Sequence, residues 1–301
     1  MIVTLFIAAV LSLLLFVVGC AHRVLQYYRL PLHLRWEIYP VPHEPPQRAA
    51  YGGSYFEETD WWTKARTKNR GGELRFMLKE IFAFDSVREH NPGLWWRSLL
   101  FHLGLYCLVA FVVLELKIYF FGQLLHQLLI LEPTAVLIGR AGLVFVATGT
   151  LALLWRRVTD PNLRDYTHIA DYLHLSFISL TSLVLLAGSL PSSPSCQVIL
   201  RGLFSQDTQV RIPVLLAVGL LLAFAVLAYV PYSHMAHFIA KYFTFHAVRW
   251  DDATNVGDAL REPMSRNLAY RPTWWAAHVG ADGSRSWADI VMADPTREDR
   301  Q

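Results

Sequence analysis

The chain has 301 residues, of which 54% are hydrophobic and only 17% are charged. A soluble globular domain carries about 25% charged residues, so this composition argues against that class. The net charge of +3 gives no indication of a nucleic-acid partner, because the basic side chains gather in the connections between apolar segments.

Five apolar segments are long enough to cross a bilayer as helices, which takes about 20 residues with few charges. They cover residues 2–18, 98–116, 134–155, 169–190 and 212–232. The sequence therefore predicts an all-α integral membrane protein in which five transmembrane helices pack as a bundle.

We expect the chain to have four parts. They are a first transmembrane helix (1–22), a cytoplasmic connection (23–94), a four-helix membrane domain (95–241) and a cytoplasmic tail (242–301). No Lys or Arg precedes the first segment, so we interpret it as an uncleaved helix and not as a signal peptide. Most Lys and Arg residues lie in the connections on one side, which places the N-terminus outside and the tail in the cytoplasm.

The connection before the second transmembrane helix contains an amphipathic pattern over Glu73–Phe84, with Leu74, Leu78 and Ile81 on one face. The pattern predicts a helix that lies on the membrane or under a partner, or one that forms the core of a small cytoplasmic domain. Asn91, Pro92 and Gly93 then predict a break in the chain.

Three cysteines, Cys20, Cys107 and Cys196, are scattered and form no CxxC motif. They cannot build an iron–sulfur cluster or a zinc site within this chain. If the protein exchanges electrons with such clusters, a partner supplies them.

Two histidines lie in apolar segments, where an ionisable side chain is costly and marks a functional hypothesis. His102 is early in the second predicted helix and His237 at the end of the antiparallel fifth, so both are expected at similar depth. Two imidazoles so placed can be the axial ligands of a b-type haem. Hydrogen bonding between helices (His102) or contact with the interface (His237) is the alternative. His234 would contact a haem propionate, a quinone or a partner, or would replace His237 as ligand.

The fourth segment opens with further polar groups. His168 and His174 are six residues apart, which places their side chains about 120° apart around an α-helix. They therefore cannot both face one iron. Asp171 and Tyr172 between them are candidates for proton exchange with a quinone, or for ordinary hydrogen bonding between helices. Arg140 in the third segment would reach for the interface or face a cofactor carboxylate.

Several of these segments resemble one family. RSLLFHLGLYCLVAF resembles the second helix of the gamma (cytochrome b) subunit of respiratory nitrate reductases. LALLWRRVTDP is similar to the end of that family's third helix, and VPYSHMAHFIA to the end of its fifth. The long connection before the second helix resembles more closely the membrane subunit of heterodisulfide-reductase-type and Dsr-type complexes.

The resemblance implies that His102 and His237 ligate the haem nearer the cytoplasm, with His234, His174 and His168 as further cofactor-binding candidates. Nitrate reductase gamma subunits hold a second haem, but Val112 and Gly219 occupy the matching positions here and cannot ligate iron. We therefore expect one haem b and leave a second open.

On this resemblance the chain is the membrane-anchoring cytochrome b subunit of a respiratory oxidoreductase in a prokaryotic inner membrane. It would transfer electrons between quinone and a cytoplasmic iron–sulfur subunit of the heterodisulfide-reductase type, with further membrane or periplasmic subunits as additional partners. The alternatives are a nitrate reductase gamma subunit proper, and a haem-free scaffold or transporter.

Overall fold

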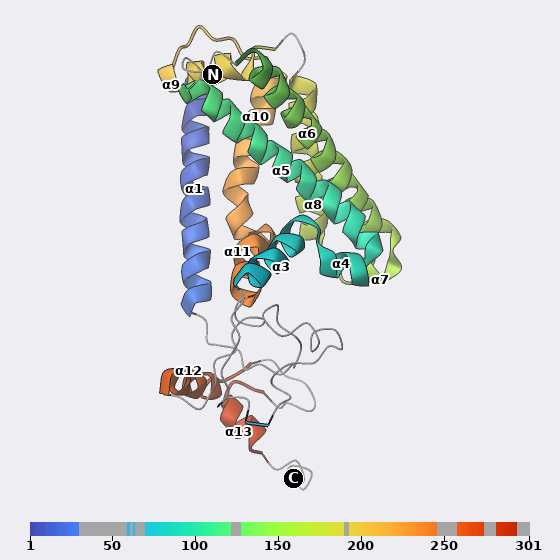
Figure 1. Cartoon of the computed structure of the whole chain (residues 1–301), viewed down its shortest axis with the longest axis vertical. Helices are drawn as coiled ribbons and strands as arrows, with labels where there is room; N and C mark the ends of the chain where they lie inside the picture. Colours follow the sequence, from blue (N-terminus) through green and yellow to red (C-terminus); the bar gives the residue numbers. More distant parts are fainter. Residues whose placement is uncertain are drawn as a thin grey trace. The chain divides into compact units, whose positions relative to one another are not determined.

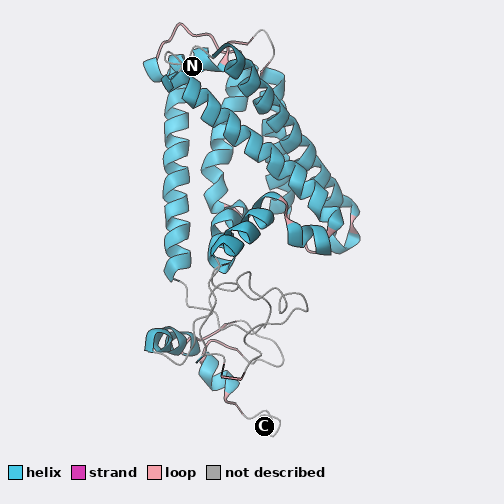
Figure 2. Ribbon diagram, viewed as in Figure 1, coloured by secondary structure: helices cyan, strands magenta, loops and turns pink. Residues whose placement is uncertain are grey.

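The computed structural model describes residues 1–29, 59–60, 63, 70–121, 128–189, 193–245, 258–273 and 281–293. Within these ranges the regular structure consists of α-helices and short 3-10 turns, and no strand is present (Figure 2). The prediction of an all-α chain is confirmed for this part of the protein.

Five helices are long and apolar enough to cross a membrane, so the chain is a multi-pass membrane protein. They are α1 (Ile2–Arg29), α5 (Pro92–Phe121), α6 (Leu128–Thr159), α8 (Ile169–Gly188) and α10 (Val214–Tyr229). Three of them extend well beyond the apolar segments that predict them, because helical hydrogen bonding continues into polar sequence until a residue breaks it. The helix α5 begins at Pro92, since proline suits the first helical turn.

Shorter helices lie in the connections. They are α3 (Arg70–Phe82), α4 (Asp85–His90), α7 (Pro161–Arg164), α9 (Cys196–Ser205), α11 (His237–Phe245), α12 (Asp258–Leu268) and α13 (Trp287–Val291), together with the 3-10 turns η4 (Val230–Tyr232) and η5 (His234–Ala236). The amphipathic helix predicted over Glu73–Phe84 is present as α3. It ends earlier than expected because Phe84 has a left-handed backbone, with φ of 51°.

The chain divides into two compact units. The first unit comprises Met1–Gly19 and Leu74–Met235, and the second comprises Cys20–Glu73 and Ala236–Gln301.

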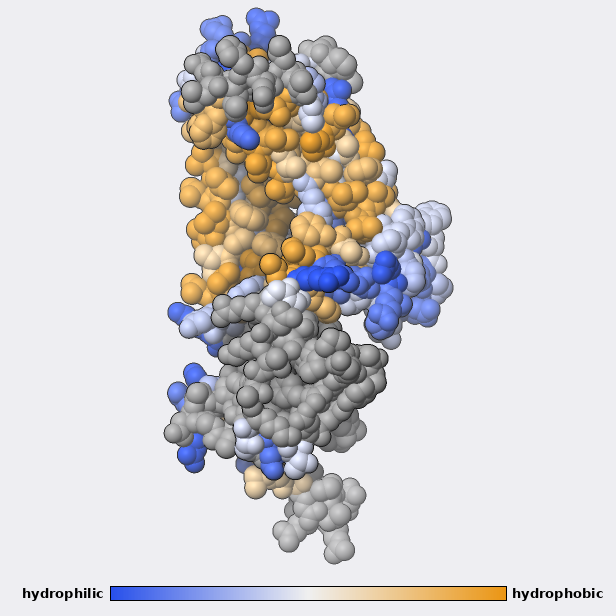
Figure 3. Space-filling view, in the orientation of Figure 1, coloured by the Kyte–Doolittle hydropathy of each residue, from blue (hydrophilic) through white to orange (hydrophobic). Residues whose placement is uncertain are grey.

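Within the first unit, α5 packs along α6, α6 on α8, and α8 on α10 (Figure 1). Glycines allow α5 and α6 to approach closely: a Cβ on Gly104 would lie 2.6 Å from the Val146 backbone nitrogen, and one on Gly149 the same distance from that of Phe101. At one end of the unit lie α4 and α7, and at the other lies α9 (Figure 1). Between these ends the surface over the long helices is predominantly hydrophobic (Figure 3).

Two clusters of buried side chains form the core of the first unit. Toward α9, Ile2 and Leu5 of α1 pack with Leu216 and Ala217 of α10. Toward α4 and α7, the second cluster joins α5, α6 and α8; its buried members are Phe101, Val146 and Ile178. The second cluster fixes the helices that carry the histidines of the first unit.

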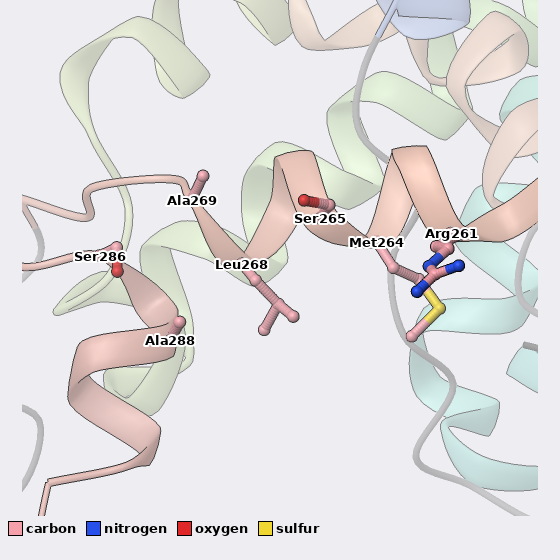
Figure 4. A pocket seen from close by; sticks show the side chains of 7 residues that line it. All are labelled: Arg261, Met264, Ser265, Leu268, Ala269, Ser286 and Ala288. Carbon is pink, nitrogen blue, oxygen red and sulfur yellow. The ribbon is translucent and has the colours of Figure 1, made fainter.

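The second unit contains a small helical pair. The Trp287 amide donates to the Tyr270 carbonyl over 2.8 Å, which ties α13 to the end of α12. Hydrogen bonds from Ser286 hold the pKa of Asp289, in the first turn of α13, below its usual range. A pocket of about 540 Å³ lies beside these helices (Figure 4), and its lining residues are Arg261, Met264, Ser265, Leu268, Ala269, Ser286 and Ala288. None of the predicted site residues lines it.

Candidate functional site

His102 is half-buried in α5, with its ring oriented by a local hydrogen bond. Its Nδ1 lies 2.7 Å from the Ser98 carbonyl oxygen. A carbonyl can only accept, so Nδ1 carries the proton and, in the neutral ring, the lone pair is on Nε2. The same arrangement orients histidines that ligate metals. His102 therefore has the tautomer that axial ligation requires.

The connection before α5 is fixed beside this histidine. The Phe84 ring lies 4.8 Å from the His102 ring, between centroids. Trp95 donates its indole N–H to the Ala83 carbonyl over 2.7 Å, and the Tyr106 hydroxyl donates to the Ile81 carbonyl over 2.8 Å. The end of α3 is thus attached to α5 on both sides of His102.

His174 is buried in α8, with 5% of its surface exposed. Neither ring nitrogen has a hydrogen-bond partner among the described residues. Its ring lies 5.1 Å from that of His234 and 5.3 Å from that of Tyr229, between centroids. An unpaired buried polar group costs about 1–3 kcal/mol. This imidazole is therefore suited to a ligand from outside the chain.

Three further polar side chains lie beside His174. His234 Nε2 is 3.3 Å from one Asp171 carboxylate oxygen, and Arg157 is 3.8 Å from the other. The Tyr172 hydroxyl donates to the Arg157 carbonyl over 3.2 Å. We call His174, His234, Asp171 and Arg157 the histidine cluster. The structure thus brings together three predicted residues from α8 and η5, and adds Arg157 of α6, which the sequence did not indicate.

His168 does not join the histidine cluster. It is exposed and immediately precedes α8, and its backbone N–H donates to Asp171 over 3.2 Å. Its backbone thus contributes to the start of the helix. His168 is exposed whereas His174 is buried, so the two histidines do not face one site, as their six-residue separation predicts.

The region around His237 differs from the prediction that it ends the fifth transmembrane helix. The helix α10 ends at Tyr229 and gives way to η4 and η5, and His237 begins α11. The physical reason is Pro231, which has no N–H to donate and clashes with a helical backbone. His237 is exposed and belongs to the second unit. Its pairing with His102 stays a prediction.

Arg140 is half-buried in α6 and donates to the Ser189 carbonyl over 2.7 Å. Ser189 follows the last residue of α8, where carbonyls lack helical partners. Arg140 thus binds the end of a neighbouring helix, a role that neither sequence interpretation included.

The structure also describes Val112 and Gly219, which match the outer haem ligands in the family that the sequence resembles. Val112 is exposed on α5. A Cβ on Gly219 would lie 2.9 Å from the Leu185 side chain, so this glycine allows α10 to approach α8.

The sequence reasoning missed one polar pair, Glu115 of α5 and Gln197 of α9. Gln197 donates to the Glu115 carboxyl over 2.5 Å, and both side chains are buried. The signal was available for Glu115, an acidic residue inside an apolar segment. For Gln197 there was none, because it lies outside the five predicted membrane segments, in the helix α9, whose N-cap is Ser195.

No group of three or more His, Cys, Asp or Glu side chains in the described ranges could hold a bare metal ion. Haem differs, because the porphyrin supplies four ligands and the protein only one or two imidazoles. The tautomer of His102 and the unpaired nitrogens of His174 fit that requirement.

Comparison of the chain with protein-family models, with curated proteins and with solved structures finds no match.

Proposed function

We propose that this protein is the membrane-anchoring b-type cytochrome subunit of a respiratory complex, transferring electrons between quinone and a cytoplasmic iron–sulfur subunit. The observation that carries the proposal is the buried His174 imidazole, which has no partner for either nitrogen in the described structure. An apolar helix can accommodate such a group when an external ligand, such as haem iron or a quinone oxygen, completes its bonding.

The candidate residues would have the following roles. Ser98 holds the His102 ring with Nε2 as the ligating nitrogen. On the family resemblance, His237 is the second ligand of that haem. Haem, when bound, supplies a one-electron carrier inside the membrane.

The histidine cluster provides either a further axial ligand or a quinone site. His174 can bind iron through its lone pair, or it can donate its N–H to a quinone carbonyl or accept from a quinol hydroxyl. Asp171 and His234 lie within 3.3 Å and can share the proton that quinone chemistry takes up or releases. The ratio of haem to protein distinguishes the two roles: two haems favour His174 as a ligand, and one favours a quinone site.

The test is the spectrum of the whole chain, purified in detergent after expression in a haem-producing host. We expect redox-sensitive b-type bands, and both His102→Ala and His237→Ala should lose the haem nearer the cytoplasm. His90→Ala is the matched control, because His90 makes the same bond to the carbonyl four residues earlier, at 2.9 Å, but is exposed at the end of α4. A folded protein without b-type bands would overturn the proposal and favour a haem-free scaffold or transporter.

A further inference from the structure

Glu115 is a buried acid in a membrane helix. Only 2% of its surface is exposed. It lies thirteen residues after His102 in α5, which corresponds to about 20 Å along the helix axis. A carboxyl group at such a position is expensive to ionise and is a functional hypothesis in itself.

Gln197 is its partner from α9. The amide Nε2 donates both to the Glu115 carboxyl oxygen Oε2, over 2.5 Å, and to the Glu115 backbone carbonyl, over 3.0 Å. The backbone carbonyl can only accept, so these contacts fix which end of the amide faces Glu115. The amide oxygen Oε1 of Gln197 is therefore the atom that these two hydrogen bonds leave unused.

Two buried oxygens of this pair have no partner among the described residues. They are Oε1 of Glu115 and Oε1 of Gln197. If Glu115 were ionised, both atoms would be acceptors without a donor. A single proton on Glu115 Oε1 gives both oxygens a hydrogen bond, because the resulting O–H can donate to the Gln197 oxygen. A neutral acid and an amide then form two reciprocal hydrogen bonds.

The titratable groups that act on Glu115 in the described structure do not include a cation. They are Glu132 of α6 and Cys196 of α9, both of them acids. Burial raises the pKa of the Cys196 thiol, so this group stays neutral. The Cys196 thiol hydrogen-bonds the carboxyl group and Glu132 repels a negative charge on it, so neither neighbour stabilises a carboxylate as a cation would.

We propose that Glu115 and Gln197 form a proton-binding site inside the membrane domain, in which the carboxylate takes up one H⁺ and the neutral acid pairs with the amide. The site lies at the α9 end of the first unit, away from the histidine cluster. At this position the protein can store and release a proton whether or not it binds haem.

Infrared spectroscopy of the intact protein at pH 7 tests this proposal. Exposed carboxyls, with usual pKa values of about 4, are ionised at that pH, so a carboxylic-acid C=O band reports a shielded acid. We expect such a band in the wild type and its loss in Glu115→Gln. Glu80→Gln is the matched control and keeps the band, because the buried Glu80 accepts from both the amide and the hydroxyl of Ser86.

A second variant covers the case in which Glu115→Gln does not fold. In Gln197→Leu the acid band should stay but move to higher frequency, because the carboxyl C=O loses its N–H donor. A wild type without an acid band, a band that persists in Glu115→Gln, or one unmoved in Gln197→Leu overturns the proposal. Haem spectra of Glu115→Gln are expected to match the wild type, so this test is independent of the proposed function.

Discussion

The polar side chains at the two ends of the first unit have different surroundings within the apolar bundle. In the histidine cluster the side chains are partly open to solvent: Arg157, His234 and Asp171 are 35%, 63% and 19% exposed, respectively. At the other end Glu115 is enclosed with an uncharged amide. The first arrangement is suited to ions that exchange with water, and the second to a single proton.

The largest expected effect concerns access to the Glu115 end. Burial raises the pKa of the Cys196 thiol above its ordinary value of 9.0, so at pH 8 Cys196 should contain at least about tenfold less thiolate and be alkylated correspondingly more slowly. Mass spectrometry of iodoacetamide-treated protein, native against SDS-unfolded, measures this ratio. Equal alkylation rates in native and unfolded protein would show that the α9 end is open to water. The two ends of the first unit would then not differ in their access to solvent.

Helix packing provides the next comparison. A Cβ on Gly104 would meet backbone atoms of Val146 and Gly142, at 2.6 and 2.8 Å, whereas one on Gly139 would meet the Phe111 ring. Backbone cannot move as a ring can, so Gly104→Ala should lower the free energy of unfolding by about 3 kcal/mol and Gly139→Ala by less. Unfolding by SDS titration in mixed micelles compares them. Equal losses would mean that both contacts are equally rigid.

The Glu115–Gln197 pair should show strong coupling. Gln197→Leu leaves the carboxyl buried without its donor, which should cost about 2 kcal/mol. Glu115→Leu combined with Gln197→Leu should recover most of that loss, because no polar group then remains unpaired. The same SDS titrations of both single variants and the double variant complete the cycle, and strictly additive losses would contradict a direct interaction.

The smallest effect is expected in the histidine cluster. Asp171→Asn removes an ion pair whose members are partly exposed, and such pairs contribute at most about 1 kcal/mol. A loss well below that of Gln197→Leu would support the contrast between the two ends. A larger loss would indicate that the cluster is more enclosed than its exposure suggests.

The sequence by itself determined the five membrane helices, because apolar length and helical hydrogen bonding are local properties. It also marked His102, whose orienting partner Ser98 is only one turn away. The helix ends were less predictable: Pro231 ends the fifth helix before His237, although apolar residues continue on both sides.

Only the tertiary structure decided which polar groups meet. His234 lies beside Asp171, Arg140 beside Ser189, and Gln197 beside Glu115, pairs separated by 63, 49 and 82 residues respectively. Hydropathy is a sum over neighbours in the chain, whereas these contacts depend on how whole helices pack. For that reason the histidine cluster was predicted in part, and the buried acid at the opposite end was not.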